Sequence, residues 1–397
     1  MLTLLKRGAA VAAVVLSAYS AAPAQVPPQV QTKAGPLAVT SLAKLEHPWG
    51  MAYLPDGRLL ITEKPGRLRI LSADGKLSEA VPGTPAVAYK GQGGLLDVAV
   101  DPKFAENKLV YLSYAEPGEQ PEGTKDSPDV RLGANFKADD PQVKGGAVAR
   151  AKLDGDKLSD LQVIWRQVPK TVGRGHFGGR IVFAPDGTLF ITSGERQRFE
   201  PAQDPNTNLG AIARINPDGS IPKDNPFANK PGVRPDLYTT GNRNPLGAAV
   251  HPATGKLWVN EMGPKGGDEL LLIEPGRNFG WPTVGVQAKH YNDAPIPEHA
   301  TRPEFAPPAL AWTPVISPSG MAFYTGDLIP GWKGSALIGG LSSKAVIRVT
   351  IEGEKATEAE RLDMKARIRD VMQGNDGALL VLTDGAKGEL LRLAPAK

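Results

Sequence analysis

Residues 174–195 read RGHFGGRIVFAPDGTLFITSGE, and this stretch contains the unit from which the rest of the chain is built. Two apolar runs of β type, 180–184 and 188–192, flank a Pro-Asp-Gly turn at 185–187, which predicts a β-hairpin. His176 lies just before the first run, where a glycine-rich loop meets a sheet, and reactive groups often lie in such places.

The same unit, an apolar run, a turn and a second apolar run, occurs six times along the chain. The copies begin at Gly50, Asp97, Arg180, Gly247, Gly320 and Arg369. A further strand-like segment follows each copy, and these segments begin at Arg67, Ala147, Ala211, Glu269, Ala345 and Glu389. Repeats of several short strands are typical of β-propellers, in which each blade buries its faces against its neighbours.

We therefore predict an all-β fold, a six-bladed β-propeller with four-stranded antiparallel blades. Residues 37–45 alternate like a strand, and we expect them to complete the sheet of the last repeat and so close the ring. Residues 37–397 then form one domain, preceded by a flexible lead-in at 25–36. The alternative is two smaller β domains, which the even spread of the copies disfavours.

Three spacings between strands are long, at 117–146, 225–237 and 281–311. Loops of this length in a compact domain are usually functional or disordered. We expect these loops to build one face of the propeller and to wall a cleft there.

Residues 1–24 are predicted to form a secretory signal peptide. Lys6 and Arg7 precede an apolar run at 9–22, and Ala-Pro-Ala at 22–24 fits a cleavage site. We therefore expect a periplasmic protein without stable membrane insertion. A retained anchor is the alternative, although the run is short for a transmembrane helix.

The composition excludes several classes of function. The chain has 0 cysteines, so it has no disulfides and no thiol chemistry. The formal net charge is only +4, and the basic residues are scattered, so nucleic acid is not an expected partner. We expect a small-molecule substrate and a monomer or a homodimer.

Two glycine-rich segments offer groups for chemistry. Among the 5 histidines, His176 is the candidate general base, because a neutral imidazole near pH 7 commonly takes a proton. A histidine packed at the head of a strand is the alternative. Gln92 lies in the segment Gly-Gln-Gly-Gly at 91–94, where glycines let the backbone approach a flat ligand. A simple turn is the alternative there.

Two arginine motifs suggest an anionic ligand. Arg243 and Asn244, in the segment GNRNP at 241–245, offer a guanidinium fork and an amide, unless they form a surface turn. Arg367 and Arg369 are two residues apart on a strand, so they share one face. Their repulsion calls for an anion or carboxylates nearby, unless both face solvent.

The run EMGPKGGDE at 261–269 combines a glycine-proline turn with carboxylates, which suits a hard cation such as calcium. A solvated acidic turn is the alternative. All five motifs lie just before a repeat or at the end of its hairpin, so they are expected to converge on one face. A base, several cations, an amide pair and a calcium fit a polycarboxylate cofactor better than a bare hydrolytic metal.

The chain resembles a known family in six sequence motifs. The motifs are HPWGMAYLPDG, GQGGLLDVAVDP, HFGGRIVFAPDG, GNRNPLGAAVHP, MGPKGGDELLLIEPGRNFGWP and RIRDV. Together they are similar to the soluble PQQ-dependent glucose dehydrogenases, and most closely to the aldose sugar dehydrogenase branch, over about residues 45–393. The resemblance implies a six-bladed propeller and a quinoprotein that oxidises aldoses.

The resemblance also implies roles for individual residues. His176 matches the base that takes the proton of the anomeric hydroxyl. The residues that match those holding the cofactor PQQ are Gln92, Arg243, Asn244, Lys344, Arg367 and Arg369. Backbone carbonyls of Gly263 and Pro264 match ligands of the calcium that touches PQQ, whereas Glu269 and the Phe279 carbonyl resemble ligands of a second, structural calcium. In the glucose dehydrogenase branch an aspartate precedes the base, whereas this chain has Gly175 there, and Phe279 stands where a tyrosine is common.

The implied reaction is hydride transfer from C1 of the sugar to the C5 carbonyl carbon of PQQ, while His176 removes the hydroxyl proton. Arg243 and calcium would stabilise the charge that develops on the C5 oxygen. The aldose becomes its lactone, and electrons then pass to an unknown acceptor. The alternatives are a calcium-dependent lactonase or esterase, which needs carboxylates and asparagines converging on a central metal, and a non-catalytic binding propeller.

Overall fold

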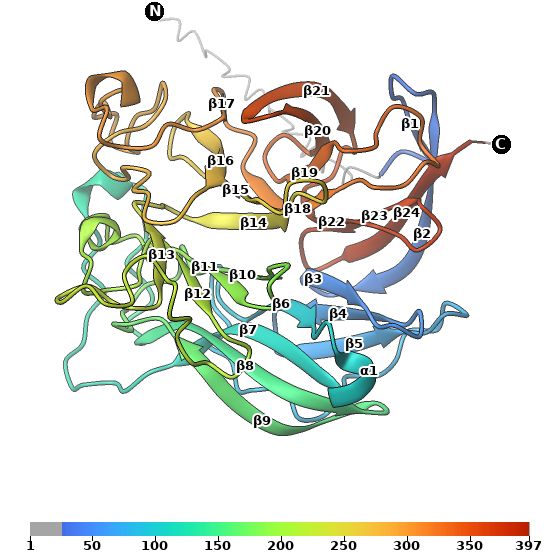
Figure 1. Cartoon of the computed structure of the whole chain (residues 1–397), viewed down its shortest axis with the longest axis horizontal. Helices are drawn as coiled ribbons and strands as arrows, with labels where there is room; N and C mark the ends of the chain where they lie inside the picture. Colours follow the sequence, from blue (N-terminus) through green and yellow to red (C-terminus); the bar gives the residue numbers. More distant parts are fainter. Residues whose placement is uncertain (1–25, 397) are drawn as a thin grey trace, which may run out of the picture.

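The computed structural model describes residues 26–396, which form six antiparallel sheets around a common axis (Figure 1). The six-bladed β-propeller predicted from the repeats is thereby confirmed. The predicted signal peptide at 1–24 lies outside the described residues.

Each blade begins with its innermost strand, and strands that follow each other in sequence pair side by side. Blade 1 contains β3 (Pro48–Tyr53), β4 (Leu59–Glu63) and β5 (Arg67–Leu71). Blade 2 contains β6 (Leu95–Val100), β7 (Leu109–Pro117), β8 (Lys144–Asp154) and β9 (Lys157–Arg166). Blade 3 contains β10 (Gly178–Phe183), β11 (Leu189–Ser193), β12 (Ala211–Ile215) and β13 (Leu237–Thr240). Blade 4 contains β14 (Pro245–Val250), β15 (Leu257–Glu261), β16 (Asp268–Ile273) and β17 (Leu310–Trp312). Blade 5 contains β18 (Pro318–Phe323), β19 (Ala336–Gly340), β20 (Ala345–Glu352) and β21 (Lys355–Asp363).

Blade 6 closes the ring with strands from both ends of the chain. After β22 (Ile368–Gln373), β23 (Leu379–Thr383) and β24 (Gly388–Pro395), the next strand is β2 (Leu37–Leu45). It pairs antiparallel with β24, as predicted. The short strand β1 (Gln29–Val30) then adds a fifth strand, so part of the lead-in that was expected to be flexible packs on the ring. Blade 1 has three strands, so two of the six blades depart from the predicted four.

Helical structure is minor. Among the described residues it consists of α1 (Phe104–Asn107) and three 3-10 turns, η1 (Val130–Leu132), η2 (Glu200–Gln203) and η3 (His299–Thr301). Within residues 26–396, no helix has the length and apolarity needed to cross a membrane.

Six of the eight hydrophobic clusters among residues 26–396 lie between neighbouring blades, one for each pair. Between blades 3 and 4, for example, Phe190 of β11 packs in one cluster with Val259 of β15. Between blades 6 and 1, Leu382 of β23 packs in one cluster with Ile61 of β4. Burial of each side chain of this size contributes about 1.5–3 kcal/mol to stability. Because each blade buries its apolar faces against its neighbours, the blades stabilise one another.

A buried ion network ties the innermost strands together on the axis. Arg180 of β10 forms ion pairs of 3.0 Å with Asp97 of β6 and with Asp370 of β22. Its guanidinium also lies 4.3 Å from the ring centroid of Trp49 in β3. A Cβ at Gly320 of β18 would overlap Asp370 Oδ1, so only glycine fits there. This network fixes five blades at the floor of the cavity described below.

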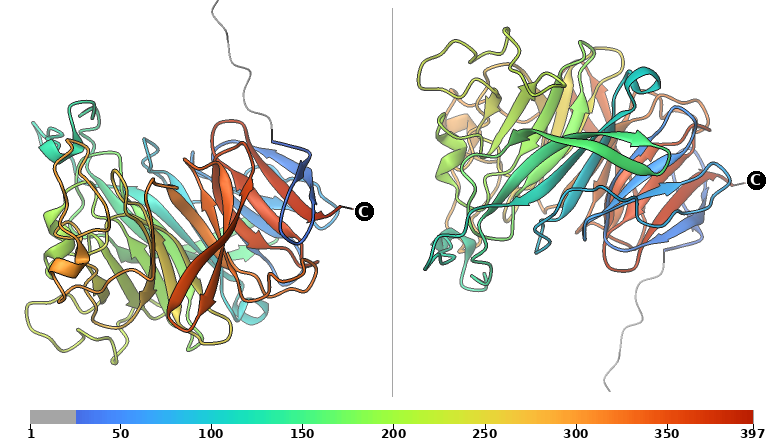
Figure 2. Two further views of the ribbon diagram at one scale, coloured as in Figure 1. Left: turned by 90° about the horizontal axis from the view of Figure 1, so that it is seen from above. Right: turned by 90° about the horizontal axis from the view of Figure 1, so that it is seen from below.

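Two of the long loops, 117–146 and 281–311, lie at one edge of the ring in all views (Figures 1 and 2). They pack on each other, because the Tyr291 backbone N–H donates to the Arg131 carbonyl at 3.0 Å. Residues of the loop 281–311 line the smaller of the two cavities described below, whereas the loops 117–146 and 225–237 line neither. The expected cleft wall therefore comes from one of the three loops.

Candidate active site

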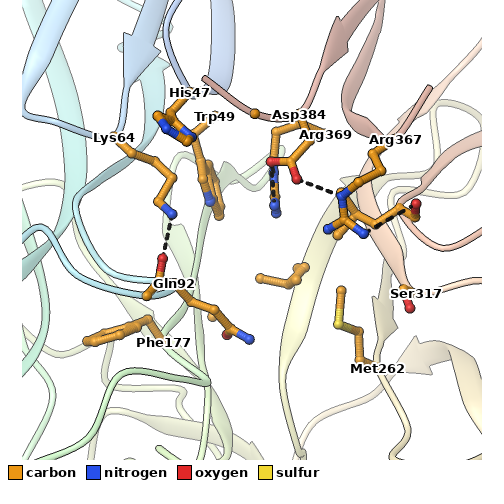
Figure 3. A pocket seen from close by; sticks show the side chains of 15 residues that line it. His47, Trp49, Lys64, Gln92, Phe177, Met262, Ser317, Arg367, Arg369 and Asp384 are labelled. Atoms are coloured by element: carbon orange, nitrogen blue, oxygen red, sulfur yellow. Dashed lines mark hydrogen bonds and ion pairs between the residues drawn. The ribbon is translucent and has the colours of Figure 1, made fainter. Parts of the chain in front are cut away.

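A cavity of about 390 Å³ opens on the propeller axis, with all six blades contributing to its wall. Its apolar lining residues include Trp49, Phe177, Leu246 and Met262. Its polar lining residues include Lys64, Gln92, Arg367, Arg369 and Asp384 (Figure 3). A flat, negatively charged molecule suits such a combination of apolar surfaces and cations.

The two arginines predicted to share a face do so, at one side of this cavity. Arg367 Nε donates to Asp384 Oδ2 at 2.9 Å, and Arg369 Nη2 donates to Asp384 Oδ1 at 2.9 Å. Burial raises the pKa of Asp384, but Arg369 and Arg367 outweigh it and lower that pKa to about 2. One carboxylate thus serves two guanidinium groups, which leaves this wall positive.

The candidate base His176 is held by a carboxylate. Its Nδ1 lies 2.5 Å from Glu195 Oε1, whereas the other oxygen, Oε2, accepts the backbone N–H of Phe199 at 2.8 Å. Within residues 26–396, no group hydrogen-bonds His176 Nε2. Burial and the nearby Arg243 lower the pKa of His176 to about 4, against the opposite effect of Glu195. The imidazole is therefore neutral near pH 7, and Glu195 places its proton on Nδ1.

The backbone before His176 is fixed by a second buried arginine. His176 has a φ of 51°, in the left-handed region, so surrounding contacts must hold it there. The Arg196 guanidinium donates to the carbonyls of Gly175 at 2.9 Å and Gly173 at 2.5 Å, and lies 3.9 Å from the Phe177 ring centroid. A Cβ at position 175 would overlap the end of the Gln197 side chain, so a larger residue there would require Gln197 to move.

The predicted amide pair lies beside this base. The His176 backbone N–H donates to Gln92 Oε1 at 2.8 Å. Asn244 Nδ2 lies 3.5 Å from the same Gln92 oxygen, and Asn244 Oδ1 accepts the Gly178 backbone N–H at 3.3 Å. The structure thus brings Gln92, His176 and Asn244 together from three blades.

Arg243 connects this group to the glycine-proline turn. Its Nη1 donates to the carbonyls of Met262 at 2.8 Å and Gly263 at 3.2 Å. Its buried Nε has no hydrogen-bond partner within the described chain. Met262 lines both the axial cavity and a second cavity of about 20 Å³, which Arg243 also lines.

The four residues predicted to bind metal all line this small cavity, namely Gly263, Pro264, Glu269 and Phe279. Glu261 lies opposite Glu269 on the neighbouring strand, and both carboxylates are buried. Burial and then the Glu269 charge raise the pKa of Glu261 to about 8. Burial also raises the pKa of Glu269, although His299, 3.7 Å away, acts in the opposite direction. Two buried carboxylates beside backbone carbonyls form a pair that a cation would stabilise.

Of the residues predicted to bind the cofactor or the proton, Gln92, Arg367 and Arg369 line the axial cavity. His176 and Asn244 lie behind its wall, hydrogen-bonded to Gln92, and Arg243 lines the small cavity instead.

Lys344 lies away from both cavities. Its side chain is exposed, and its charge acts on Asp363 of β21. At this blade the wall is formed by Leu341 and Ser317. The lysine that does line the cavity is Lys64 of blade 1.

Sequence reasoning missed three side chains of the candidate site, Glu195, Asp384 and Lys64. Glu195 closes the hairpin motif that contains His176, and the need of a buried base for a carboxylate partner was the available signal. Asp384 follows β23 and lies opposite Arg367 across the β22–β23 hairpin of blade 6. Lys64 follows β4 of blade 1, and its position relative to the arginines of blade 6 depends on ring closure. No local pattern indicates that.

Comparison with known proteins identifies the family. The chain matches the Glucose / Sorbosone dehydrogenase family over residues 45–392. It is 40% identical over 363 residues to the aldose sugar dehydrogenase YliI of Escherichia coli (strain K12), covering 89% of this chain and 91% of that protein.

Solved structures agree with this match. The soluble aldose sugar dehydrogenase from Escherichia coli in the apo form aligns with a TM-score of 0.81 at 38% identity, covering 91% of this chain and 100% of that one. The PQQ-bound aldose sugar dehydrogenase from Streptomyces coelicolor aligns with a TM-score of 0.67 at 25% identity, covering 93% and 99%. The match over most of the chain and the similarity in fold lead to one conclusion: this protein belongs to the Glucose / Sorbosone dehydrogenase family.

Proposed function

We propose that this protein oxidises an aldose at C1 to the lactone, with PQQ in the axial cavity as hydride acceptor and His176 as general base. The observation that carries the proposal is the buried His176–Glu195 pair beside a cationic cavity. Relatives named as aldose sugar dehydrogenases, and a neighbour solved with PQQ bound, support the choice of substrate and cofactor.

The residues in and next to the axial cavity fit PQQ, a flat polycarboxylate quinone. Arg367 and Arg369 have a single carboxylate between them, so they retain positive charge for cofactor carboxylates. Gln92 and Asn244 offer amides, and the unpartnered buried Nε of Arg243 offers a donor. When bound, PQQ supplies the carbonyl carbon that accepts the hydride.

His176 would take the proton of the anomeric hydroxyl on Nε2. Because Nδ1 is already bonded to Glu195, the free lone pair of the neutral ring lies on Nε2. Proton uptake creates an imidazolium, and the Glu195 carboxylate stabilises it, in the same way that a buried carboxylate supports histidine in hydrolytic triads. Removal of the hydroxyl proton makes it easier for a hydride to leave C1. Arg243 would stabilise the negative charge that develops on the hydride acceptor.

We also propose two calcium sites. The carbonyl oxygens of Met262 and Gly263 accept hydrogen bonds from the Arg243 guanidinium, so this turn directs carbonyl oxygens toward a positive charge. The carbonyl oxygens of Gly263 and Pro264 would bind the first calcium in the same way. Glu269 and the Phe279 carbonyl would bind a structural calcium near Glu261. Within residues 26–396 no cluster of three or more acidic or histidine side chains suits a metal, so backbone oxygens are needed at both sites. That also disfavours the lactonase alternative, which needs converging side-chain ligands.

Reconstitution tests this proposal. The chain from Gln25 onward is purified without cofactor, and dye reduction is followed with PQQ, calcium and a panel of aldoses. Reduction that needs PQQ, calcium and sugar together supports the proposal, and His176→Ala should abolish it while PQQ still binds. A wild-type protein that binds no PQQ would overturn the proposal. We also propose that the protein is periplasmic. Fractionation of cells that express the full chain tests this location.

A further inference from the structure

The lysine of the axial cavity comes from blade 1. Lys64 directly follows β4, and it is the lysine among the residues that line the cavity. We propose that the Lys64 ammonium binds a carboxylate of the cofactor, in the role that the sequence suggested for Lys344. This inference rests on the proposed function, because it concerns the same cofactor.

The backbone of Lys64 is firmly fixed. Its N–H donates to the His47 carbonyl at 3.0 Å, and its carbonyl accepts the N–H of Leu95 at 2.9 Å. A Cβ at Gly94 would overlap that same carbonyl, so the Gly-Gln-Gly-Gly segment can approach Lys64 only because it has a glycine there. The start of the Lys64 side chain therefore has a defined position next to Gln92.

The Lys64 side chain lies along one side of the cavity (Figure 3), and its ammonium has unused N–H donors. Its Nζ donates to the Gly91 carbonyl at 2.6 Å, and it lies opposite Arg369 and Arg367 (Figure 3). An ammonium has three N–H donors, so two remain for a ligand. A rigid molecule with carboxylates at both ends would be held by Lys64 on one wall and by the arginines on the other.

Lys64 has no ion-pair partner within the described chain. Every carboxylate of residues 26–396 lies beyond 4.0 Å from its Nζ, and the Tyr89 ring centroid lies 5.7 Å from this atom. Burial and then repulsion by Arg369 lower the pKa of Lys64 to about 8, with Asp384 acting weakly in the opposite direction. A half-buried cation under these conditions is stabilised by a bound anion.

Lys344 differs in each of these respects. It follows β19 on blade 5, its side chain is exposed, and it is absent from the cavity wall. Lys344 is therefore a matched control for Lys64, with the same side chain placed outside the cavity.

The test is the affinity of the cofactor-free protein for PQQ, measured by equilibrium dialysis without sugar or turnover. We expect Lys64→Gln to weaken binding about tenfold or more, which is typical of a lost charge-assisted hydrogen bond. Lys64→Arg should keep the affinity within about threefold, and Lys344→Gln within about twofold. Thermal melting without PQQ should show that Lys64→Gln is folded like the wild type.

Two results would overturn the inference while leaving the proposed function intact. They are wild-type affinity in Lys64→Gln, and a loss in Lys344→Gln as large as in Lys64→Gln. Failure of the wild type itself to bind PQQ is a different result, and it would overturn the proposed function together with this inference.

Discussion

Glu195 Oε1 lies 2.5 Å from His176 Nδ1, and both side chains are buried beside the axial cavity. The pair comes from the two ends of one hairpin, because His176 precedes β10 and Glu195 follows β11. Pairing of Gly178 with Ser193 brings the two ends together. The hairpin therefore positions a base and its carboxylate in one structural unit.

Replacement of Glu195 should disable the base without emptying the site. Glu195→Gln removes the charge that stabilises the imidazolium, so we expect the rate of sugar oxidation to fall by about 10²–10⁴. Affinity for PQQ should stay within about twofold. Dye-linked turnover and PQQ titration measure the two quantities. Glu200→Gln, an exposed glutamate in η2, is the control and should keep full activity. Full activity in Glu195→Gln would contradict the assigned role.

Activity should depend on pH through His176. The base works when neutral, and burial with Arg243 lowers the pKa of His176 to about 4. The value of kcat/KM should therefore be flat from about pH 5 upward through neutrality and should fall as the pH drops through about 4. Measurement of the reconstituted enzyme across pH 3.5–8 tests this, with protein integrity checked at each pH by circular dichroism. A decline centred near 6.5, the ordinary histidine pKa, would show that the bound state lacks this environment.

The sequence predicts the ring well because its signals are local. Each hairpin has its own apolar runs and turn, and the alternation of residues 37–45 defines β2 with the bounds predicted. Ion pairs across the axis are not local. Arg180 meets Asp97 and Asp370 only when blades 2, 3 and 6 are assembled, and no spacing in the sequence indicates that.

The same difference between local and non-local signals explains which site residues the sequence predicts. Gln92, His176 and Asn244 lie in motifs at the inner ends of blades, so their convergence follows from the fold. The direction in which a side chain points just after a turn does not follow from the fold. Lys344 follows β19 with a φ of 53°, and its side chain is exposed, whereas Lys64 reaches the cavity from a position with no distinctive motif.

Calcium should stabilise the protein, and more so at high pH. Burial and Glu269 raise the pKa of Glu261 to about 8, above its unfolded value. Without a cation, the stability linked to this group is fully present below about pH 4.5 and is lost as the pH rises through about 8. With chelator, Tm should fall between pH 5 and pH 8, and added calcium should restore it mainly at pH 8. Calorimetry at both pH values measures this.

The variants for the calcium experiment follow from the same cavity. Glu269→Gln should lose most of the calcium-dependent rise in Tm, because it removes a carboxylate from the small cavity. Glu274→Gln, just beyond the end of β16, should keep the rise. An identical response of both variants would contradict the structural calcium site.

The axial network makes Gly320 indispensable. A Cβ at this position would overlap Asp370 Oδ1 and lie 2.7 Å from Arg180 Nη2, so Gly320→Ala forces the buried ion pair apart. Separation of a buried pair typically costs about 3–5 kcal/mol. We therefore expect Gly320→Ala to lower the free energy of unfolding by about 3 kcal/mol or more, measured by denaturant titration. Gly146→Ala is the matched control, because the nearest atoms to its added Cβ lie 3.8 Å away, and it should change stability by less than about 1 kcal/mol. If Gly320→Ala proved as stable as Gly146→Ala, the axis would have to accommodate a methyl group, and the Arg180 network could not be the rigid floor on which Trp49 and the cavity rest.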